Sequence, residues 1–550
     1  MTTAGTLVQT NGIAPVTPKS CDDWLRILTR RMDLRRLGVL MLRSYVDGNA
    51  PLPEMTKETR QAWQDFQRRS RTNWGELVCD SVVDRLVPNG VTFNGKNDND
   101  MAKRAQKIWR DNRMQSVFKE WVRYGTIFGQ SYLTVWTGQQ TPNDQSDTVI
   151  TADSPETMIV VTDPLQHWKP RAAMKVWRNI DECRDYALVW TTTGWQQFTR
   201  PTYTRIELKV IPSKWLVNLA EGAWTKGPDD LYPNGQPGSK SEMGLPTPIP
   251  VVVYNNPGGH GDFETHIDLI NRINSNILER LVIQAMQAFR QRVIKGGMLP
   301  EKDENGKRID WERVFSPSPG ALWNLPEGFD MWESTPVDLQ GLLNSCKEDI
   351  RQLSAVTKTP LPTLMPDNTN ISAEGAKATE AGHIFRVIDR LGEAKFGVER
   401  AMELALRADG AKLKTSVIQD SDVLEVPFMN PQLITITERY TAALAAHNAG
   451  ESWKSIQRNV LGYSPDQIAQ DAIDRAEEAL LALSQPPAPT TVMERLTGQA
   501  PGAAPIESAA SGGAAPNGQQ PQPKATPASG GTQVKKAVTT VGGTQPGGGK

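Results

Sequence analysis

The chain has 550 residues, which is long enough for two to four domains, and its 61 Lys and Arg residues balance 62 Asp and Glu residues. A formal net charge of −1 excludes a protein that clamps nucleic acid tightly, because tight binding neutralises many phosphates with Lys and Arg. The four cysteines form no CxxC pair, so neither a disulfide framework nor a zinc site is expected. The polar start MTTAGTLVQTNG has no apolar segment, so we expect no signal peptide. No apolar run is long enough to span a bilayer, so we expect no membrane span. We also expect no cofactor.

The N-terminal third is predicted to be helical and then to change period. Apolar residues recur at helical spacing over 22–46, 56–69, 73–86 and 99–123, with Asn73 as a plausible N-cap of the third helix. β-branched and aromatic segments broken by turn residues follow, and they predict a mostly antiparallel, mixed sheet with strands near 130–137, 157–162, 172–178, 185–191, 205–211 and 250–254.

Two long amphipathic helices are predicted to flank a compact insert. The first begins at Phe263 and stops at Gly296 and Gly297, and residues 298–335 read as a small β-rich module. The second helix begins near Pro336 and breaks at TPLPTLMPDNTN, whose three prolines cannot continue it. A third helix is expected from Ser372 to about Ala408, ending at Asp409 and Gly410.

The remaining chain is predicted to form a small helical domain and a tail. A short strand near 422–428 precedes helices at about 431–448, 451–459 and 464–483. From Gln485 on, Pro, Gly, Ala, Ser, Thr and Gln dominate, and such a composition cannot bury enough apolar area to offset the entropy of ordering, so we expect disorder.

A search for catalytic and metal-binding patterns leaves a single cluster. No GxxxxGK[ST], HExxH or GxSxG pattern occurs, so we expect no enzyme. His260, Asp262, Glu264, His266 and Asp268 alternate every second residue, which spreads them around a helix, and acidic residues favour a helix start in any case. We therefore expect no metal, and His260, Asp262 and His266 are the only metal candidates.

Several segments together resemble the portal proteins of tailed phages, in the SPP1 gp6-like group found in phages of actinobacteria. The matching pieces follow the family's order over residues 20–480: YVDGNAPLP, NWGELVCDSVVDRLVPNGVTFNG, PIPVVVYNNP, PGALWNLPEG and ISAEGAKATE. Two turns depart from the family's pattern, GGHGDFE before the first long helix and ISAEGAKA at the third.

This resemblance implies an α+β portal fold. Its parts would be a flexible N-terminus (1–20), a mixed wing (21–261), stem helices (262–295 and 337–358), a β-rich clip (296–336), a tunnel loop (359–371), a long wing helix with a return strand (372–429), a helical crown (430–484) and a disordered tail (485–550).

The resemblance also implies a channel and its partners. About twelve subunits would form a ring at one capsid vertex, through which double-stranded DNA is packaged and ejected. The ring would be assembled in the host bacterial cytoplasm with the major capsid protein or scaffold. It would then dock the terminase large subunit and later a head–tail adaptor. The alternatives are another virion or head-completion protein without a channel, and a DNA-processing enzyme.

Candidate residues follow from these expectations. Those near DNA in the channel loop are Thr363, Met365, Asp367, Asn368 and Asn370. Those expected to pack the stem between subunits are Ile270, Ile277, Leu281, Leu342, Ile350 and Leu353. Those expected on the docking surface of the clip are Trp311, Trp323 and Trp332.

Overall fold

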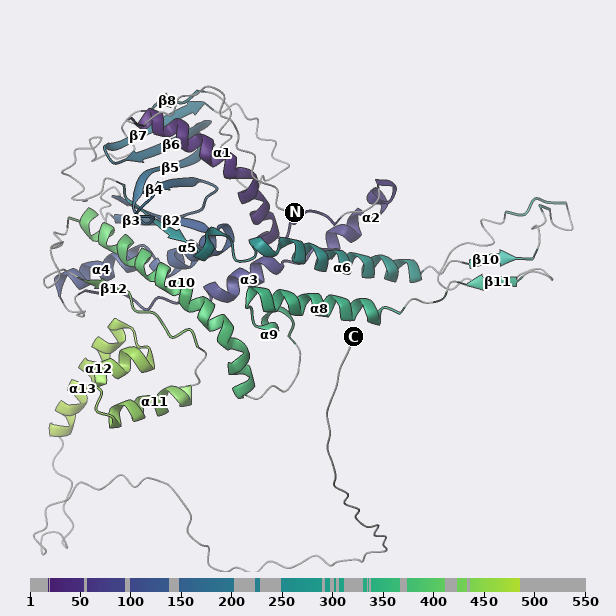
Figure 1. Cartoon of the computed structure of the whole chain (residues 1–550). Helices are drawn as coiled ribbons and strands as arrows, with labels where there is room; N and C mark the ends of the chain where they lie inside the picture. The colour runs from purple at the N-terminus through teal and green to yellow at the C-terminus, as the bar shows by residue number, and fades with distance from the viewer. Residues whose placement is uncertain are drawn as a thin grey trace, which may run out of the picture. The chain divides into compact units, whose positions relative to one another are not determined.

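The computed structural model divides by its internal contacts into two units, Met1–Glu478 and Ala479–Lys550. It describes residues 18, 20–53, 57–93, 99–137, 148–201, 223–227, 249–288, 292–296, 301–302, 306–310, 330–333, 335, 338–366, 373–410, 423–432 and 436–484. Figure 1 shows the elements discussed below. They lie in the first unit, apart from the C-terminal end of the last helix. None of the described helices is long and apolar enough to cross a membrane.

Five helices precede the sheets: α1 Cys21–Val46, α2 Lys57–Ser70, α3 Trp74–Val83, α4 Asp100–Asp111 and α5 Met114–Phe128. Ser20 and Asp23 form a capping box at the start of α1. The single helix predicted over 99–123 is wrong, because Arg113 adopts a left-handed conformation with φ 48°. Asn112 stabilises this break, since its side chain donates to the Thr148 carbonyl and accepts from the Ile150 amide.

Strands β2 to β9 form two antiparallel sheets. β2 Gln130–Thr137 lies between β3 Thr148–Asp153 and β9 Val251–Asn255. The five-stranded sheet runs β4 Met158–Thr162, β5 Pro170–Asn179, β6 Arg184–Thr191, β7 Gly194–Pro201 and β8 Thr225–Lys226. Five predicted strands coincide with β2, β4, β5, β6 and β9, and the sixth, at 205–211, lies outside the described residues. β3 and β7 were not predicted. The polar residues of the β7 sequence GWQQFTRP explain why this strand was missed.

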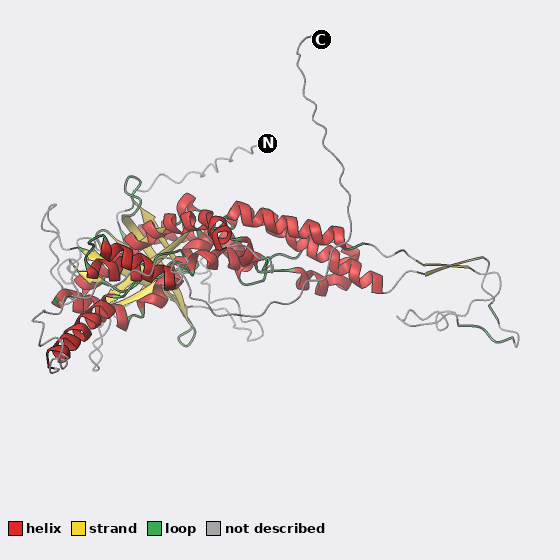
Figure 2. Ribbon diagram, turned by 90° about the horizontal axis from the view of Figure 1, so that it is seen from below, coloured by secondary structure: helices red, strands yellow, loops and turns green. Residues whose placement is uncertain are grey.

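Two helices, α6 Ile267–Ala288 and α8 Gln340–Thr357, run antiparallel to each other. Arg272 donates to the Gln352 side chain at 2.6 Å, whereas Asn276, one turn later, donates to Asp349 at 2.6 Å. The prediction that the first helix extends to Lys295 is wrong. The β-branched pair Val293 and Ile294 favours a strand instead, and β10 Arg292–Lys295 pairs with β11 Asp330–Glu333. This ladder follows α6 and precedes α8 along the chain (Figure 2).

The remaining elements follow α8. They are α9 Leu361–Leu364, α10 Ala373–Ala408, β12 Leu424–Glu425 (paired with β1 Thr92–Phe93), α11 Ile436–Asn448, α12 Trp453–Ile456, a π-helical turn Gln457–Leu461 and α13 Pro465–Ser484. The helices predicted at 431–448, 451–459 and 464–483 are confirmed in number and type. Residues of the predicted disordered tail, 485–550, lie outside the described residues.

Three of the hydrophobic cores among the described residues position the helical pair and the sheets. α4, α5 and α10 enclose the three-stranded sheet, with Trp121 and Val398 fully buried among them. The N-terminal half of α1 covers the five-stranded sheet through Leu28 and Met32. The third core joins α1, α3, α5, α6, α8 and α9 around Phe263 and Leu353, and it therefore fixes the helical pair to the rest of the unit.

Candidate functional site

A glycine-rich turn between β9 and α6 sits against the end of α5. A side chain at Gly129 would place its Cβ 2.6 Å from the Gly259 carbonyl oxygen, and one at Gly261 would lie 2.1 Å from that of Ile127. Gly129 and Gly259 also have φ values of 78° and 72°, which other residues rarely adopt. Glycine is therefore required here so that the two backbones can approach, and the next residue, Asp262, is directed inward.

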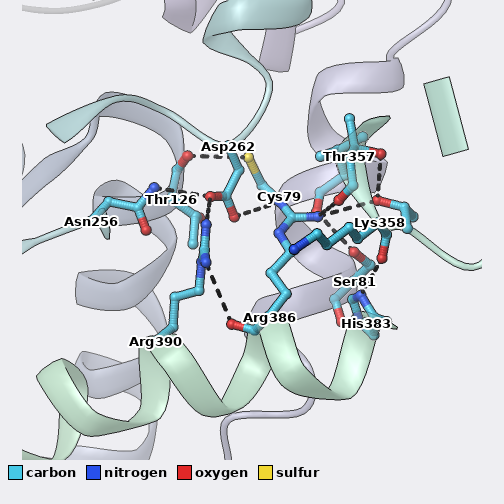
Figure 3. Close-up of polar contacts among 12 residues, drawn as sticks. Cys79, Ser81, Thr126, Asn256, Asp262, Thr357, Lys358, His383, Arg386 and Arg390 are labelled. Atoms are coloured by element: carbon cyan, nitrogen blue, oxygen red, sulfur yellow. Dashed lines mark hydrogen bonds and ion pairs between the residues drawn. The ribbon is translucent and has the colours of Figure 1, made fainter. Parts of the chain in front are cut away.

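Asp262 carries a buried charge that two arginines of α10 balance (Figure 3). Its carboxylate lies 2.7 Å from Arg386 Nη2 and 2.7 Å from Arg390 Nη2, and Asn256 donates to it at 2.9 Å. Burial alone would raise the pKa of Asp262, but the two guanidinium charges and the hydrogen bonds from Arg390 and Asn256 outweigh it and hold the pKa below its usual value. Asp262 thus ties the start of α6 to α10.

The same arginine also caps the end of α8. Arg386 Nη1 donates to the Thr357 carbonyl, one of the carbonyls that a helix end leaves without an intrahelical partner. Lys358, the C-cap, has φ 52°, a left-handed conformation more often taken by glycine. A cation at a helix C-terminus is also favoured by the helix dipole. Arg386 therefore links α8, the start of α6 and α10.

His383 completes this polar junction, which we define as Asp262, His383, Arg386 and Arg390. Its ring nitrogens lie 3.0 Å from the Ser81 carbonyl oxygen and 3.1 Å from that of Lys358, so it connects α3 to the end of α8. Burial, followed by the charges of Arg386 and Arg85, lowers the pKa of His383 in spite of the two carbonyls. A neutral imidazole has a single N–H, so with its pKa lowered His383 donates to only one of these two carbonyls.

The proposed metal candidates do not converge. Asp262 is occupied by the arginines, His260 has a side chain 61% exposed with Nδ1 3.8 Å from Glu264, and His266 has a pKa lowered by burial and by Arg386. Across the described ranges, no three His, Cys, Asp or Glu side chains are placed to hold a metal ion. The sequence did not identify the junction, because His383 appeared isolated. The pattern that could have identified the polar junction is the recurrence of His383, Arg386 and Arg390 at helical spacing within an otherwise apolar face of α10.

The candidate channel loop begins with an unexpected helical turn, α9. Leu361 and Pro362 occupy its first two positions, where a proline needs no backbone N–H, so the prolines do not exclude a short helix. Thr363 is exposed, and Met365 is half-buried against the core around Phe263 and Leu353. Asp367, Asn368 and Asn370 lie outside the described residues.

The stem candidates fall into two groups. Ile270, Ile350 and Leu353 are 1%, 8% and 0% exposed within the single chain, so little of their surface is left for a neighbouring subunit. They instead pack α6 and α8 into their own chain. Ile277, Leu281 and Leu342 are half-buried and retain surface for a neighbour.

One of the three clip tryptophans can be placed. Trp332 is 46% exposed on β11, opposite Val293, which is also 46% exposed. Trp311 and Trp323 lie outside the described residues. Val293 and Trp332 therefore give the β10–β11 ladder an exposed apolar surface.

The polar junction and the core around Phe263 and Leu353 together fix the helical pair α6 and α8 to the rest of the unit. The model of the family "Phage portal protein, SPP1 Gp6-like" matches residues 30–476. One similar solved structure is a chain of the virion of a native gene transfer agent particle, with a TM-score of 0.37 and 13% identity, covering 77% of this chain and 99% of that chain. Another is a chain of the neck of an empty gene transfer agent particle computed with C6 symmetry, with a TM-score of 0.38 and 13% identity, covering 77% of this chain and 99% of that chain. A third is a chain of the neck of a native particle computed with C12 symmetry, with a TM-score of 0.37 and 12% identity, covering 77% of this chain and 98% of that chain. No curated protein sequence matches.

The class is thus that of phage portal proteins. The chain belongs to the SPP1 Gp6-like family of phage portal proteins, since that family's model covers most of its length. The function common to this family is to form the channel at a capsid vertex through which DNA passes.

Proposed function

We propose that about twelve copies of this chain form a closed ring at one vertex of the virion, with α6 and α8 as the stem around the channel. The observation that carries this proposal is the antiparallel pair itself: one end leads into the β10–β11 ladder, and the other is anchored to α10 through the polar junction. A helical pair held at its base in this way transmits force between a docking surface and the body of the subunit. Residues 21–261 and α10 form the wing, and 430–484 form the crown.

We further propose that double-stranded DNA passes through this ring. A channel must let its cargo slide, and many Lys–phosphate and Arg–phosphate contacts would turn translocation into binding. The net charge of −1 suits sliding. We place the loop 359–371, which follows the end of α8, beside the DNA.

The β10–β11 ladder is the proposed docking surface for the terminase large subunit and later for a head–tail adaptor. Val293, Met331 and Trp332 are 46%, 38% and 46% exposed there. Exposed aromatic and aliphatic side chains on a small element are typical anchors of protein–protein interfaces. We also propose that the ring contacts the capsid protein or scaffold. It would assemble in the host cytoplasm before it is incorporated into the virion.

Negative-stain electron microscopy with mass photometry of the full-length chain tests the proposal. We expect rings with a central hole and a mass near twelve chains. A monomer or dimer that persists with capsid and scaffold proteins present would overturn the ring and favour a head-completion protein without a channel. An ATP-hydrolysis and nuclease assay of the same sample addresses the enzyme alternative, and we expect no activity.

A further inference from the structure

An apolar ridge on α1 faces away from the chain's own core. Leu34, Leu37 and Met41 are 75%, 81% and 43% exposed, and their spacing of three and four residues aligns them on one side of the helix. The opposite side is already occupied, because Leu28 and Met32 pack on the five-stranded sheet. We call Leu34, Leu37 and Met41 the α1 ridge.

A second ridge lies on α10. Phe385, Ile388 and Phe396 are 68%, 48% and 50% exposed, at spacings of three and eight residues that return to the same side of the helix. The opposite side of α10 packs on the three-stranded sheet, where Val387 and Val398 are fully buried. We call Phe385, Ile388 and Phe396 the α10 ridge. The α1 ridge and the α10 ridge lie on helices whose opposite sides pack into different cores, so both ridges are exposed in the same chain.

Each ridge contains a glycine that the chain's own packing does not explain. A Cβ added at Gly38 or Gly392 would meet nothing within 4 Å. Glycine inside a helix is less favourable than alanine. Close approach of another helix is the packing that would favour glycine at both positions.

The charges beside the two ridges are opposite in sign. Arg30 and Arg31 are exposed at the start of the α1 ridge, and Asp33 is the sole acidic residue between 30 and 41. Asp389 and Glu393 adjoin the α10 ridge, and burial raises the pKa of Glu393. Within the described ranges, none of Arg30, Arg31, Asp389 and Glu393 forms an ion pair.

We propose that the α1 ridge of one subunit packs on the α10 ridge of the next copy, with Arg30 and Arg31 facing Asp389 and Glu393. This inference rests on the proposed ring. A ring with a rotation axis needs a heterologous interface, meaning two different complementary surfaces on every chain. A symmetric contact between two α10 ridges would oppose carboxylates, and one between two α1 ridges would oppose arginines, so charge disfavours both.

Cysteine cross-linking tests the contact. The exposed Cys183 is first replaced by serine to remove background reaction, and rings of this parent chain are confirmed by microscopy. The double variant Leu37→Cys/Ile388→Cys is then treated with a short bismaleimide, and each single variant serves as its matched control. We expect a ladder of covalent species up to the full ring from the double variant, and monomers from the singles on a denaturing gel.

The outcomes separate this inference from the proposed ring. Parent rings with no ladder from the double variant, nor from Leu37→Cys/Phe385→Cys, would overturn the contact and leave the ring intact. A covalent dimer from a single variant would show that like ridges meet and would also overturn it. A parent chain that forms no ring with capsid and scaffold proteins present would remove the proposed function and this inference with it.

Charge exchange gives an independent test. Arg30→Glu/Arg31→Glu and Asp389→Lys/Glu393→Lys should each raise the protein concentration for half-assembly about tenfold, because each places like charges opposite one another. The melting temperature of the unassembled chain should change much less than assembly does, since these side chains form no ion pair within it. The fourfold variant should recover most of the loss. A loss in the fourfold variant as large as the two losses combined would contradict the pairing.

Discussion

Arg386 on α10 lies 2.7 Å from Asp262, which precedes α6, and the same guanidinium donates to the carbonyl of Thr357 at the end of α8. One buried side chain therefore fixes three segments that are far apart in sequence. Arg390 provides a second cation 2.7 Å from the same carboxylate. Because two cations depend on a single anion, the carboxylate of Asp262 is the member whose loss should matter most.

Asp262→Asn should destabilise the chain by about 3–5 kcal/mol, since it keeps the shape of the side chain but leaves two buried guanidinium groups uncompensated. Urea unfolding of the unassembled chain measures the change. Glu348→Gln is the matched control, because Glu348 pairs with Arg351 at 3.4 Å on the exposed surface of α8 and should change stability by about 0.5 kcal/mol or less. Equal losses in both variants would mean that the buried cluster does not hold α6, α8 and α10 together.

His383 should make the folded chain sensitive to mild acid. Its pKa is lowered in the folded state, so below the unfolded value near 6.5 the unfolded chain binds a proton that the folded chain does not. Stability should therefore fall as pH decreases from about 7 to about 5, by at most about 1.4 kcal/mol per pH unit. In His383→Gln, which keeps one donor, the pH dependence of the unfolding free energy should be shallower. An unchanged pH profile would assign the acid sensitivity to other groups.

The sequence predicts long regular elements well and contacts between distant polar residues poorly. The helices α1, α8 and α10 are visible from apolar spacing, and β5 and β6 from β-branched and aromatic runs. The break at Arg113 is set by hydrogen bonds from Asn112 to β3, a strand that was itself missed. Such tertiary contacts override the local pattern.

The polar junction was hidden for a related reason. Asp262 was grouped with neighbouring acids and histidines in a possible metal cluster, whereas its partners lie more than 120 residues away on α10. Similarly, apolar spacing predicted that Ile270 and Leu353 are buried but not which surface buries them. Periodicity identifies a buried side of a helix without identifying its partner.

Gly397→Ala should destabilise the chain by about 1–3 kcal/mol through overpacking. A Cβ at this position would lie 2.3 Å from the ring of Trp121, which is fully buried and cannot move aside. Gly382→Ala on the same helix is the control, because nothing lies within 4 Å of its Cβ and the better helix propensity of alanine should stabilise by up to about 1 kcal/mol. Thermal unfolding of both variants checks the opposite signs, and a stabilised Gly397→Ala would contradict the packing of α10 on α5.

Removal of residues 485–550 should leave ring assembly intact. The composition of this segment predicts disorder, and the family match ends at residue 476. Mass photometry of the truncated and full-length chains at equal concentration compares their oligomers. Loss of rings on truncation would show that the tail contributes to assembly.

Leu342→Asp and Leu281→Asp should give folded chains that do not assemble. Both side chains are half-buried in the single chain, so a carboxylate there can remain solvated until a neighbouring subunit covers it. Leu353→Asp should instead prevent folding, since Leu353 is 0% exposed and a lone charge would be buried in the chain's own core.

Ser345→Asp places the same charge at an exposed position of α8 and should form normal rings. Circular dichroism separates folded from unfolded variants, and electron microscopy then scores ring formation. Normal rings from Leu342→Asp and Leu281→Asp would show that these residues do not lie at a packed interface between subunits. The surface between stems would then have to be formed by other residues of α6 and α8, because Ile270, Ile350 and Leu353 are already used within the subunit.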